Sequence, residues 1–231
     1  MSFLHDVLSG VITRIKGEPF SLDKNIPIDY LFSFFLGKVW CLIVGICKLR
    51  RIGKCFVHSS SKIKCSSKIH VGKNLNIDRN CYIDALSING IQFGDNVSVG
   101  KNTTIECSGT LKDLGKGLKV GNNVGLGTHG FFGCAGGIEI GDNTIFGNYV
   151  SMHSENHNFS DRSQPIRLQG VNRKGIKIGS DCWIGAKVTI LDGAVIGNGC
   201  IVAAGAVVRG QFPENVIIGG VPAKIIKLRF G

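Results

Sequence analysis

Histidine is the residue type in this chain best suited to acid–base chemistry near neutral pH. Three of the six histidines, His129, His153 and His157, fall in or near one polar segment, HSENHNFSD at residues 153–161. A neutral imidazole, with an unperturbed pKa of about 6.5, can accept a proton from a hydroxyl group at pH 7. His157 is surrounded by side chains able to orient a ring nitrogen, namely Glu155, Asn156, Asn158 and Asp161. A loop histidine is more often an ordinary surface residue, so the position of this loop decides how much weight His157 carries.

The element that positions this segment is a repeat. Between Ile178 and Val208 an aliphatic residue recurs at every sixth position, at Ile178, Ile184, Ile190, Ile196, Val202 and Val208. A fixed period of this kind indicates a solenoid. One large aliphatic residue in six suits a triangular coil of short parallel strands, with the aliphatic side chain inside and small residues at the corners. The 33 glycines fit such corners.

The same phase continues towards the N-terminus with interruptions, through Val71, Ile77, Ile83, Phe93, Val99, Ile105, Val120, Leu126, Phe132, Ile140, Phe146 and Met152. Each slip in the count places an insertion at a corner of the coil. The largest slip lies between Met152 and Ile178, where the chain is polar and contains Pro165. We therefore expect an excursion loop over residues 153–175. Long loops that leave a rigid scaffold commonly carry function, and this one contains His157.

Residues 31–47, LFSFFLGKVWCLIVGIC, are almost wholly apolar and precede Lys48, Arg50, Arg51 and Lys54. A spanning helix needs about 20 apolar residues, and a mid-span charge such as Lys38 costs about 3 kcal/mol, so crossing a bilayer is marginal. Two interpretations stay open: a helix that caps the end of the solenoid, or an interfacial or re-entrant helix that contacts the membrane through residues 29–51. The start, MSFLHDV, does not look like a cleavable signal. We expect an N-terminal helical segment over residues 1–56 and a solenoid domain over residues 57–231.

The composition narrows the compartment and the partners. Nine cysteines without a C-x-x-C pair favour reduced thiols in the cytoplasm over disulfides or a zinc site. A net charge of +11 suggests an anionic partner. The chain offers neither a recognition helix nor interleaved aromatic and basic residues, so a membrane surface and a phosphorylated ligand are favoured over nucleic acid.

Four features together resemble the hexapeptide-repeat acetyltransferases: the six-residue period, HSENHNFSD, IGSDCWIGAKVTILDGAVIG at residues 178–197, and GGVPAKIIK at residues 219–227. The chain is most similar to the sugar O-acetyltransferases of capsule, O-antigen and exopolysaccharide clusters, over about residues 50–227. The resemblance implies an all-β, left-handed parallel β-helix with a short basic C-terminal tail. It also implies a homotrimer with active sites between subunits, acetyl-CoA as co-substrate and no metal.

The resemblance also assigns roles to residues of this chain. His157 would be the general base that deprotonates an acceptor hydroxyl as it attacks the thioester. The backbone N–H of Ala186, after Gly185, would stabilise the oxyanion; the galactoside enzymes carry serine there, and a backbone donor survives that change. Trp183 would line the pantetheine tunnel or simply pack at a corner.

Further positions follow from the same resemblance. The residues expected to contact CoA are Ala204, Arg209, Gly210, Lys224 and Lys227. Gly210 replaces a lysine of the galactoside enzymes, and Arg209 is expected to substitute for it. The acceptor is expected to meet His129, Phe131, Glu155 and Asn156. Basic residues of the excursion would attract a lipid-linked diphosphate or an acidic sugar, or keep the loop in water; they are Arg162, Arg167, Arg173 and Lys174.

The predicted function is transfer of an acetyl group from acetyl-CoA to a hydroxyl of a cell-surface polysaccharide or its lipid-linked precursor, in the cytoplasm at the inner face of the membrane. One alternative is an O-acetyltransferase of a drug or free sugar. Another is a γ-type carbonic anhydrase, with His129, His153 and His157 as metal ligands. A third is a non-catalytic scaffold.

Overall fold

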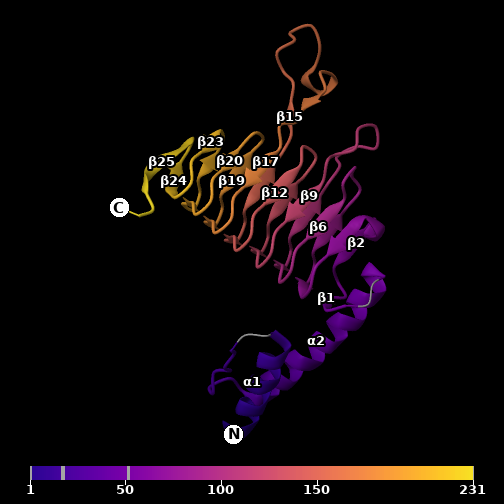
Figure 1. The fold of residues 1–231 in the computed structure, drawn as a ribbon. Helices are drawn as coiled ribbons and strands as arrows, with labels where there is room; N and C mark the ends of the chain where they lie inside the picture. The colour runs from indigo at the N-terminus through magenta and orange to yellow at the C-terminus, as the bar shows by residue number, and fades with distance from the viewer. Residues whose placement is uncertain (1, 17–18, 51–52, 231) are drawn as a thin grey trace. The chain divides into compact units, whose positions relative to one another are not determined.

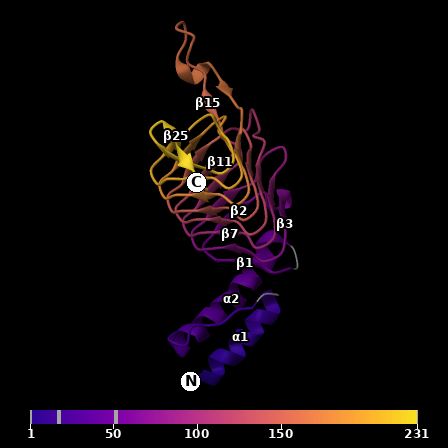
Figure 2. The ribbon, with the colours of Figure 1, turned by 60° about the vertical axis from the view of Figure 1, so that its left-hand side comes forward.

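The computed structural model describes residues 2–16, 19–50 and 53–230, and the side chains of residues 5–14, 19–50 and 53–230. The chain divides into two compact units, Met1–Trp40 and Cys41–Gly231. The first unit contains helix α1 (Ser2–Lys16) and the N-terminal part of helix α2 (Ile28–Leu49), which lie beside each other in Figures 1 and 2. In this unit His5 is buried, and its Nε2 lies 2.9 Å from the carbonyl oxygen of Ile26. The connection after α1 therefore folds back along the helix.

The second unit is a three-sided parallel β-helix, because successive strands of the chain belong in turn to sheets A, B and C (Figure 1). Sheet A contains, in order, β1 (Cys55–Val57), β4 (Leu75–Ile77), β7 (Ser98–Val99), β10 (Gly125–Leu126), β13 (Ile145–Phe146), β18 (Trp183–Ile184), β21 (Ile201–Val202), β24 (Val216–Gly220) and β25 (Ala223–Leu228). Sheet B contains β2 (Lys62–Lys64), β5 (Tyr82–Asp84), β8 (Thr104–Glu106), β11 (Phe131–Gly133), β14 (Ser151–His153), β19 (Thr189–Leu191) and β22 (Val207–Val208). Sheet C contains β3 (Ile69–Val71), β6 (Ile91–Phe93), β9 (Leu118–Val120), β12 (Ile138–Ile140), β17 (Ile176–Ile178), β20 (Val195–Ile196) and β23 (Gln211–Phe212). Short 3-10 helices cover Ser66–Lys68 and Ile166–Leu168.

The predicted repeat forms the core of this β-helix. All six aliphatic residues of the run from Ile178 to Val208 are buried and stack in register, as Ile184 does on Val202 and Ile190 on Val208. The twelve residues that continue the phase towards the N-terminus are buried as well. The strands are two or three residues long, so each coil adds one inward side chain per side, and the stack makes one continuous apolar interior.

The three corners of the coil are named here by the sheets that they join. Small residues are required where one coil packs on the next: a Cβ atom at Gly179 would lie 2.6 Å from the backbone nitrogen of Asn198. The B–C corner accommodates the insertions. Residues 107–117 join β8 to β9 there, and residues 154–175 join β14 to β17. The predicted excursion is therefore an insertion at the B–C corner, and Figure 1 shows it projecting beyond the coil.

The C-terminal end of α2 packs on the first coil of the β-helix. Leu49 is buried in the core cluster, and Val44 packs against that cluster. Lys48 Nζ donates to the carbonyl oxygens of Ser59, at 2.7 Å, and Ser61. Most large apolar side chains of α2 that precede this contact are exposed, including Phe32, Phe34, Leu36, Val39, Trp40 and Ile43. By length and composition α2 is able to cross a membrane, and among the described residues it is the only such helix.

The basic C-terminal segment is a strand. Strand β25 pairs antiparallel with β24 at the end of sheet A, with Lys227 opposite Ile217 and Lys224 opposite Gly219. Arg229 then donates from Nη1 to Asp181 Oδ2 at 2.8 Å and to the carbonyl oxygen of Gly199 at 3.1 Å. The predicted tail is thus held on the last coils.

Candidate active site

His157 lies at the base of the excursion. Strand β15 (Asn156–His157) pairs antiparallel with β16 (Val171–Asn172), so that His157 is opposite Val171. The side chain is exposed, and no residue within the described ranges hydrogen-bonds to its ring. This two-stranded stem places the imidazole beside the β-helix and leaves both ring nitrogens open to a substrate.

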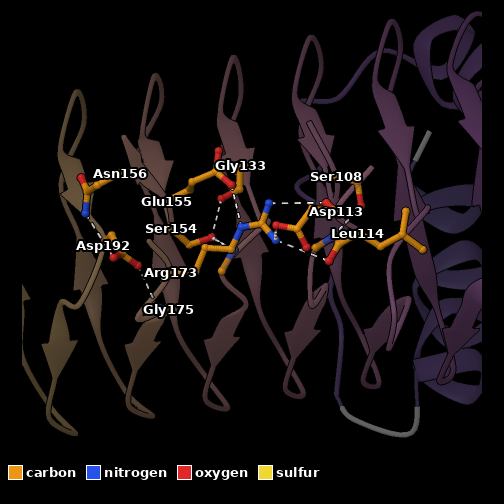
Figure 3. Close-up of polar contacts among 12 residues, drawn as sticks. Ser108, Asp113, Leu114, Gly133, Ser154, Glu155, Asn156, Arg173, Gly175 and Asp192 are labelled. Atoms are coloured by element: carbon orange, nitrogen blue, oxygen red, sulfur yellow. Dashed lines mark hydrogen bonds and ion pairs between the residues drawn. The ribbon is translucent and has the colours of Figure 1, made fainter. Parts of the chain in front are cut away.

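Arg173 holds one side of this stem (Figure 3). Its Nε donates to Glu155 Oε2 at 2.6 Å, and its Nη1 lies 3.0 Å from Asp113 Oδ2 in the 107–117 insertion. Weaker contacts reach the carbonyl oxygens of Asp113 and Leu114. The Arg173 side chain is only 13% exposed, so these charge-assisted bonds are partly shielded from water. The expectation that Arg173 keeps the loop in water or attracts an anion is therefore wrong, because its charge is neutralised by two carboxylates.

Asp192 holds the other side of the stem. Its Oδ1 accepts from the backbone N–H groups of Lys174, at 2.9 Å, and Gly175, at 2.7 Å, while Oδ2 accepts from Asn156 Nδ2 at 3.1 Å (Figure 3). Ser154 fixes the start of the excursion: its buried hydroxyl donates to the carbonyl oxygen of Gly133 at 2.7 Å and accepts from the N–H of Gly136 at 2.9 Å. Glu155 and Asn156, expected at the acceptor, thus have their side chains engaged in holding His157 in place.

Ala186 lies on the A–B corner, at the opposite edge of sheet B from the excursion. Along the C–A corner, the N–H groups of Asp95, Asn122, Asp142 and Ser180 each donate to a side-chain oxygen of the next coil at 2.7–3.0 Å. The A–B corner differs, because Ala204 stands in the next coil beside Ala186 and has no side-chain acceptor. Among residues 53–230 the N–H groups of Ala186 and Ala204 have no acceptor. Two backbone donors are therefore free at this corner.

The other expected CoA residues divide between the two corners. Trp183 points out of sheet A and is half exposed, in register with Ile145 and Ile201. Lys224 and Lys227 are exposed on β25 of the same sheet. Gly185 is buried beneath the A–B corner. In contrast, Arg209 and Gly210 lie on the B–C corner, where they line a cavity of about 310 Å³ with Asn156, Lys174, Leu191, Asp192 and Gly193.

The other two histidines of the expected cluster lie apart from His157. His129 has a left-handed backbone, with φ of 57°, at the A–B corner; its ring stacks on Tyr149 at 4.7 Å, and Asn102 Nδ2 lies 2.8 Å from Nε2. His153 faces outward from sheet B, where it packs on Phe131 at 5.4 Å. Phe131 thus meets a histidine of its own chain. No group of three or more His, Cys, Asp or Glu side chains suited to a metal ion occurs in the part of the chain that the structure describes.

The buried thiols are poor nucleophiles. Burial raises the pKa of Cys182 to about 11 and also raises the pKa of Cys81. Cys134 is fully enclosed, and burial raises the pKa of its thiol well above its ordinary value. These thiols are protonated at neutral pH, whereas the thiolate is the nucleophile.

Two holding residues were missed in the sequence, Asp113 and Asp192. Asp192 had a visible signal, since it precedes Gly193 at the first corner of the regular run that follows the excursion. Asp113 had none, because its pairing with Arg173 depends on which coils the two insertions occupy. The site assembled in one chain therefore consists of His157 and its holders at the B–C corner, and two free N–H groups at the A–B corner.

Comparison with known proteins places the chain among bacterial transferases. A family model described as "Bacterial transferase hexapeptide (six repeats)" matches residues 175–210. "Probable acetyltransferase Rv3034c" of Mycobacterium tuberculosis is 35% identical over 58% of this chain and only 44% of its own length. "Putative lipopolysaccharide biosynthesis O-acetyl transferase WbbJ" of Escherichia coli K12 is 32% identical over 64% of this chain and 75% of its own length.

A solved structure is also similar. A mutant of AntD, an N-acyltransferase from Bacillus cereus crystallised with dTDP and coenzyme A, has a TM-score of 0.57 and 24% identity, covering 69% of this chain and 84% of AntD. This likeness concerns the fold, and the left-handed parallel β-helix expected from the sequence is confirmed.

Proposed function

This chain belongs to the hexapeptide-repeat transferase family, and from that premise we propose that it is an acetyl-CoA-dependent O-acetyltransferase with His157 as its general base. The observation that carries the proposal is the pairing of two features: an exposed histidine held by Arg173 and Asp192, and two free backbone donors at Ala186 and Ala204. The names of the relatives support acetyl transfer, and that of WbbJ supports a glycan acceptor.

The chemistry follows from these groups. A neutral His157 nitrogen accepts the proton of an acceptor hydroxyl as the hydroxyl oxygen bonds to the thioester carbon of acetyl-CoA. The carbonyl oxygen then carries negative charge, which the N–H of Ala186 stabilises. When the tetrahedral intermediate collapses, the carbon–sulfur bond breaks, the proton on His157 passes to the departing sulfur, and the acetyl ester and CoA are released. A general base of this kind contributes about 10² to 10⁴ in rate.

The site requires two copies of the chain, because His157 and Ala186 lie at opposite edges of sheet B. Rotation of one copy about an axis parallel to the coil sets the B–C corner of one copy against the A–B corner of the next. Repeating that rotation closes a ring, and a homotrimer provides three such sites. We therefore place the acetyl-CoA thioester between subunits.

Sheet B is the face that suits this assembly. Its central outward column is half-buried and mostly uncharged, formed by Tyr82, Thr104, Phe131, Ser151, Thr189 and Val207. The outward column of sheet C is largely polar and exposed, with His70, Gln92, Lys119, Glu139, Lys177 and Gln211. Desolvating the sheet B column costs less than desolvating the charged column of sheet C. Sheet C is left facing water.

CoA is proposed to follow sheet A from the A–B corner. The half-exposed Trp183 offers an apolar surface for pantetheine, Ala204 offers its free N–H, and Lys224 and Lys227 offer charge for phosphates. Arg209 and Gly210 lie on the other corner, so they meet a CoA bound to the neighbouring copy. Their cavity borders the stem that carries His157.

Helix α2 is proposed to contact a membrane peripherally. Its last turn packs on the first coil, which leaves about 16 residues, or about 24 Å, for the bilayer, less than the hydrocarbon thickness of about 30 Å. The exposed face is rich in aromatic residues and is followed by Lys48, Arg50 and Lys54. These features fit a helix that enters one leaflet, with its basic end at anionic headgroups of the cytoplasmic face. Such a position suits a lipid-linked acceptor.

The test is acceptor-dependent release of CoA, followed with a thiol reagent, using purified protein, acetyl-CoA and glycan extracted from the host. The His157→Ala variant is expected to lose about 10² to 10⁴ in rate while its melting temperature stays unchanged. His70→Ala is the matched control, because His70 is exposed on sheet C. Full activity of His157→Ala, or an absence of transfer by the wild-type protein, would overturn the proposal.

A further inference from the structure

A short motif occurs twice in the chain at equivalent positions of the β-helix. Lys116–Lys119 reads KGLK and Lys174–Lys177 reads KGIK. Strand β9 pairs with β12 and β12 pairs with β17, so Lys119, Glu139 and Lys177 form one outward column of sheet C. The coil itself does not require these lysines, because Gln92 and Glu139 occupy the same strand position in neighbouring coils.

The two motifs line the largest groove found on the described part of the chain. The groove measures about 410 Å³ and follows the B–C corner along the coil axis. We call it the lysine groove, formed by Lys116, Lys119, Lys174 and Lys177. Its floor is the glycine between the lysines of each motif, together with Gly137 of the intervening coil. These three glycines have φ values of 115°, 89° and 93°, a left-handed conformation that glycine adopts freely.

The charge of the groove is positive and spread out. Glu139 is its one acidic lining residue, and it lies 3.8 Å from Lys177. Successive coils are about 4.8 Å apart, so the two pairs of lysines are separated by about 10 Å along the groove. One end of the groove meets the stem of the excursion, because Asp192 binds the N–H of Lys174 and the side chain of Asn156, next to His157.

The backbone of the floor excludes a compact phosphate site. Such sites use converging free N–H groups. Here the N–H of Gly117 donates to the carbonyl oxygen of Cys134 at 3.2 Å, and the N–H of Gly175 donates to Asp192 at 2.7 Å. The N–H of Gly137 donates to Cys134 as well, at 3.0 Å. Only the separated ammonium groups remain to meet an anion.

We propose that the lysine groove binds an extended acidic glycan, with carboxylates spaced to meet its two lysine pairs, and leads that chain to His157. The proposal rests on the proposed function for the reaction, but the binding itself is independent of it. It assigns the acceptor class: a polysaccharide that carries uronic or other acidic sugars. It also explains why sheet C, which lies outside the face proposed for the trimer, carries the repeated motif.

The test is calorimetric binding to the full chain without acetyl-CoA. The probes are tetragalacturonate, an acidic oligosaccharide, and maltotetraose, its neutral counterpart. The variant Lys119→Gln/Lys177→Gln is expected to bind tetragalacturonate about fivefold to tenfold more weakly than the wild type, as loss of two exposed charge contacts implies. The matched control Lys73→Gln/Lys101→Gln removes the same charge from exposed lysines at the other two corners and is expected to leave binding unchanged.

Three results would overturn the proposal. They are equal binding of the two probes, equal weakening by the groove and control variants, and displacement of tetragalacturonate by pyrophosphate at a lower concentration, which would indicate a compact phosphate site. Acetyl transfer is measured in parallel. If tetragalacturonate binds in the groove but no transfer depends on His157, the proposed function fails and the binding site stands. If transfer depends on His157 but the groove variant binds tetragalacturonate like the wild type, only this inference fails.

Discussion

Arg173 Nε lies 2.6 Å from Glu155 Oε2, and this contact joins the two strands of the excursion at the level where the excursion leaves the β-helix. Glu155 precedes His157 by two residues, and Arg173 follows by two residues Val171, the strand partner of His157. The same guanidinium binds Asp113 of a second insertion. One side chain therefore fixes the excursion both to itself and to the neighbouring coil.

Replacing Arg173 with alanine is expected to lower kcat for acetyl transfer about tenfold to a hundredfold, with the KM for acetyl-CoA unchanged. The reason is that misplacement of a reacting group by about 1 Å costs on this order, whereas the free donors at Ala186 and Ala204 are not touched. Steady-state kinetics checks the split between kcat and KM. Arg162→Ala is the control, because Arg162 is exposed on the same excursion and has no ion pair among the described residues. Equal losses in both variants would mean that Arg173 does not position His157.

Replacing Gly179 with alanine is expected to destabilise the β-helix by about 1–3 kcal/mol. The new Cβ atom would lie 2.6 Å from the backbone nitrogen of Asn198, and backbone at a packed corner has little room to move. A lower melting temperature by scanning calorimetry checks this expectation. Gly109→Ala serves as the control, since no atom lies within 4 Å of its added Cβ atom, and its melting temperature is expected to stay near that of the wild type.

The buried thiols predict a loss of stability at alkaline pH. Burial raises the pKa of Cys182 in the folded chain to about 11, above its ordinary value of 9.0. The contribution of the protonated thiol is fully present below about pH 9 and is lost as the pH rises towards 11. Melting temperatures of the wild type and Cys182→Ala are therefore expected to converge between pH 9 and 11. Parallel curves over that range would show that Cys182 does not titrate as its burial requires.

Membrane contact through α2 is expected to bury Trp40. The chain contains two tryptophans, so Trp183→Phe leaves Trp40 as the sole reporter. On vesicles of phosphatidylglycerol and phosphatidylethanolamine, its fluorescence should shift to the blue and be quenched by lipids brominated on their acyl chains. The reciprocal variant, Trp40→Phe, reports from the β-helix and should show neither effect. Unquenched Trp40 fluorescence, or association of α2 helices without lipid, would count against the membrane.

The fold was predictable because it depends on local period. Ile184 and Ile190 are six residues apart, and that spacing alone sends both side chains inward on successive sides of the coil. The excursion was predictable for the same reason, as the place where the period stops. His157 could be singled out from its polar neighbours.

The contacts that hold His157 were not predictable. Arg173 and Asp113 are 60 residues apart, and they meet only because two insertions of different length emerge from the same corner of different coils. The free N–H groups of Ala186 and Ala204 depend on which side chain stands in the next coil, and that register is known only after every insertion has been counted. The packing of the last turn of α2 on the first coil likewise has no local signal.

The anchors Ser154 and Asp192 accept hydrogen bonds from the backbone where the excursion begins and ends, yet both stand on the coil and not on the excursion itself. The segment between them can therefore be regarded as a cassette. Its length and sequence are free to vary between relatives without disturbing the β-helix, provided that the two anchors and the glycines that they bind are kept. Exchange of the cassette is thus a route by which one coil could acquire new acceptors.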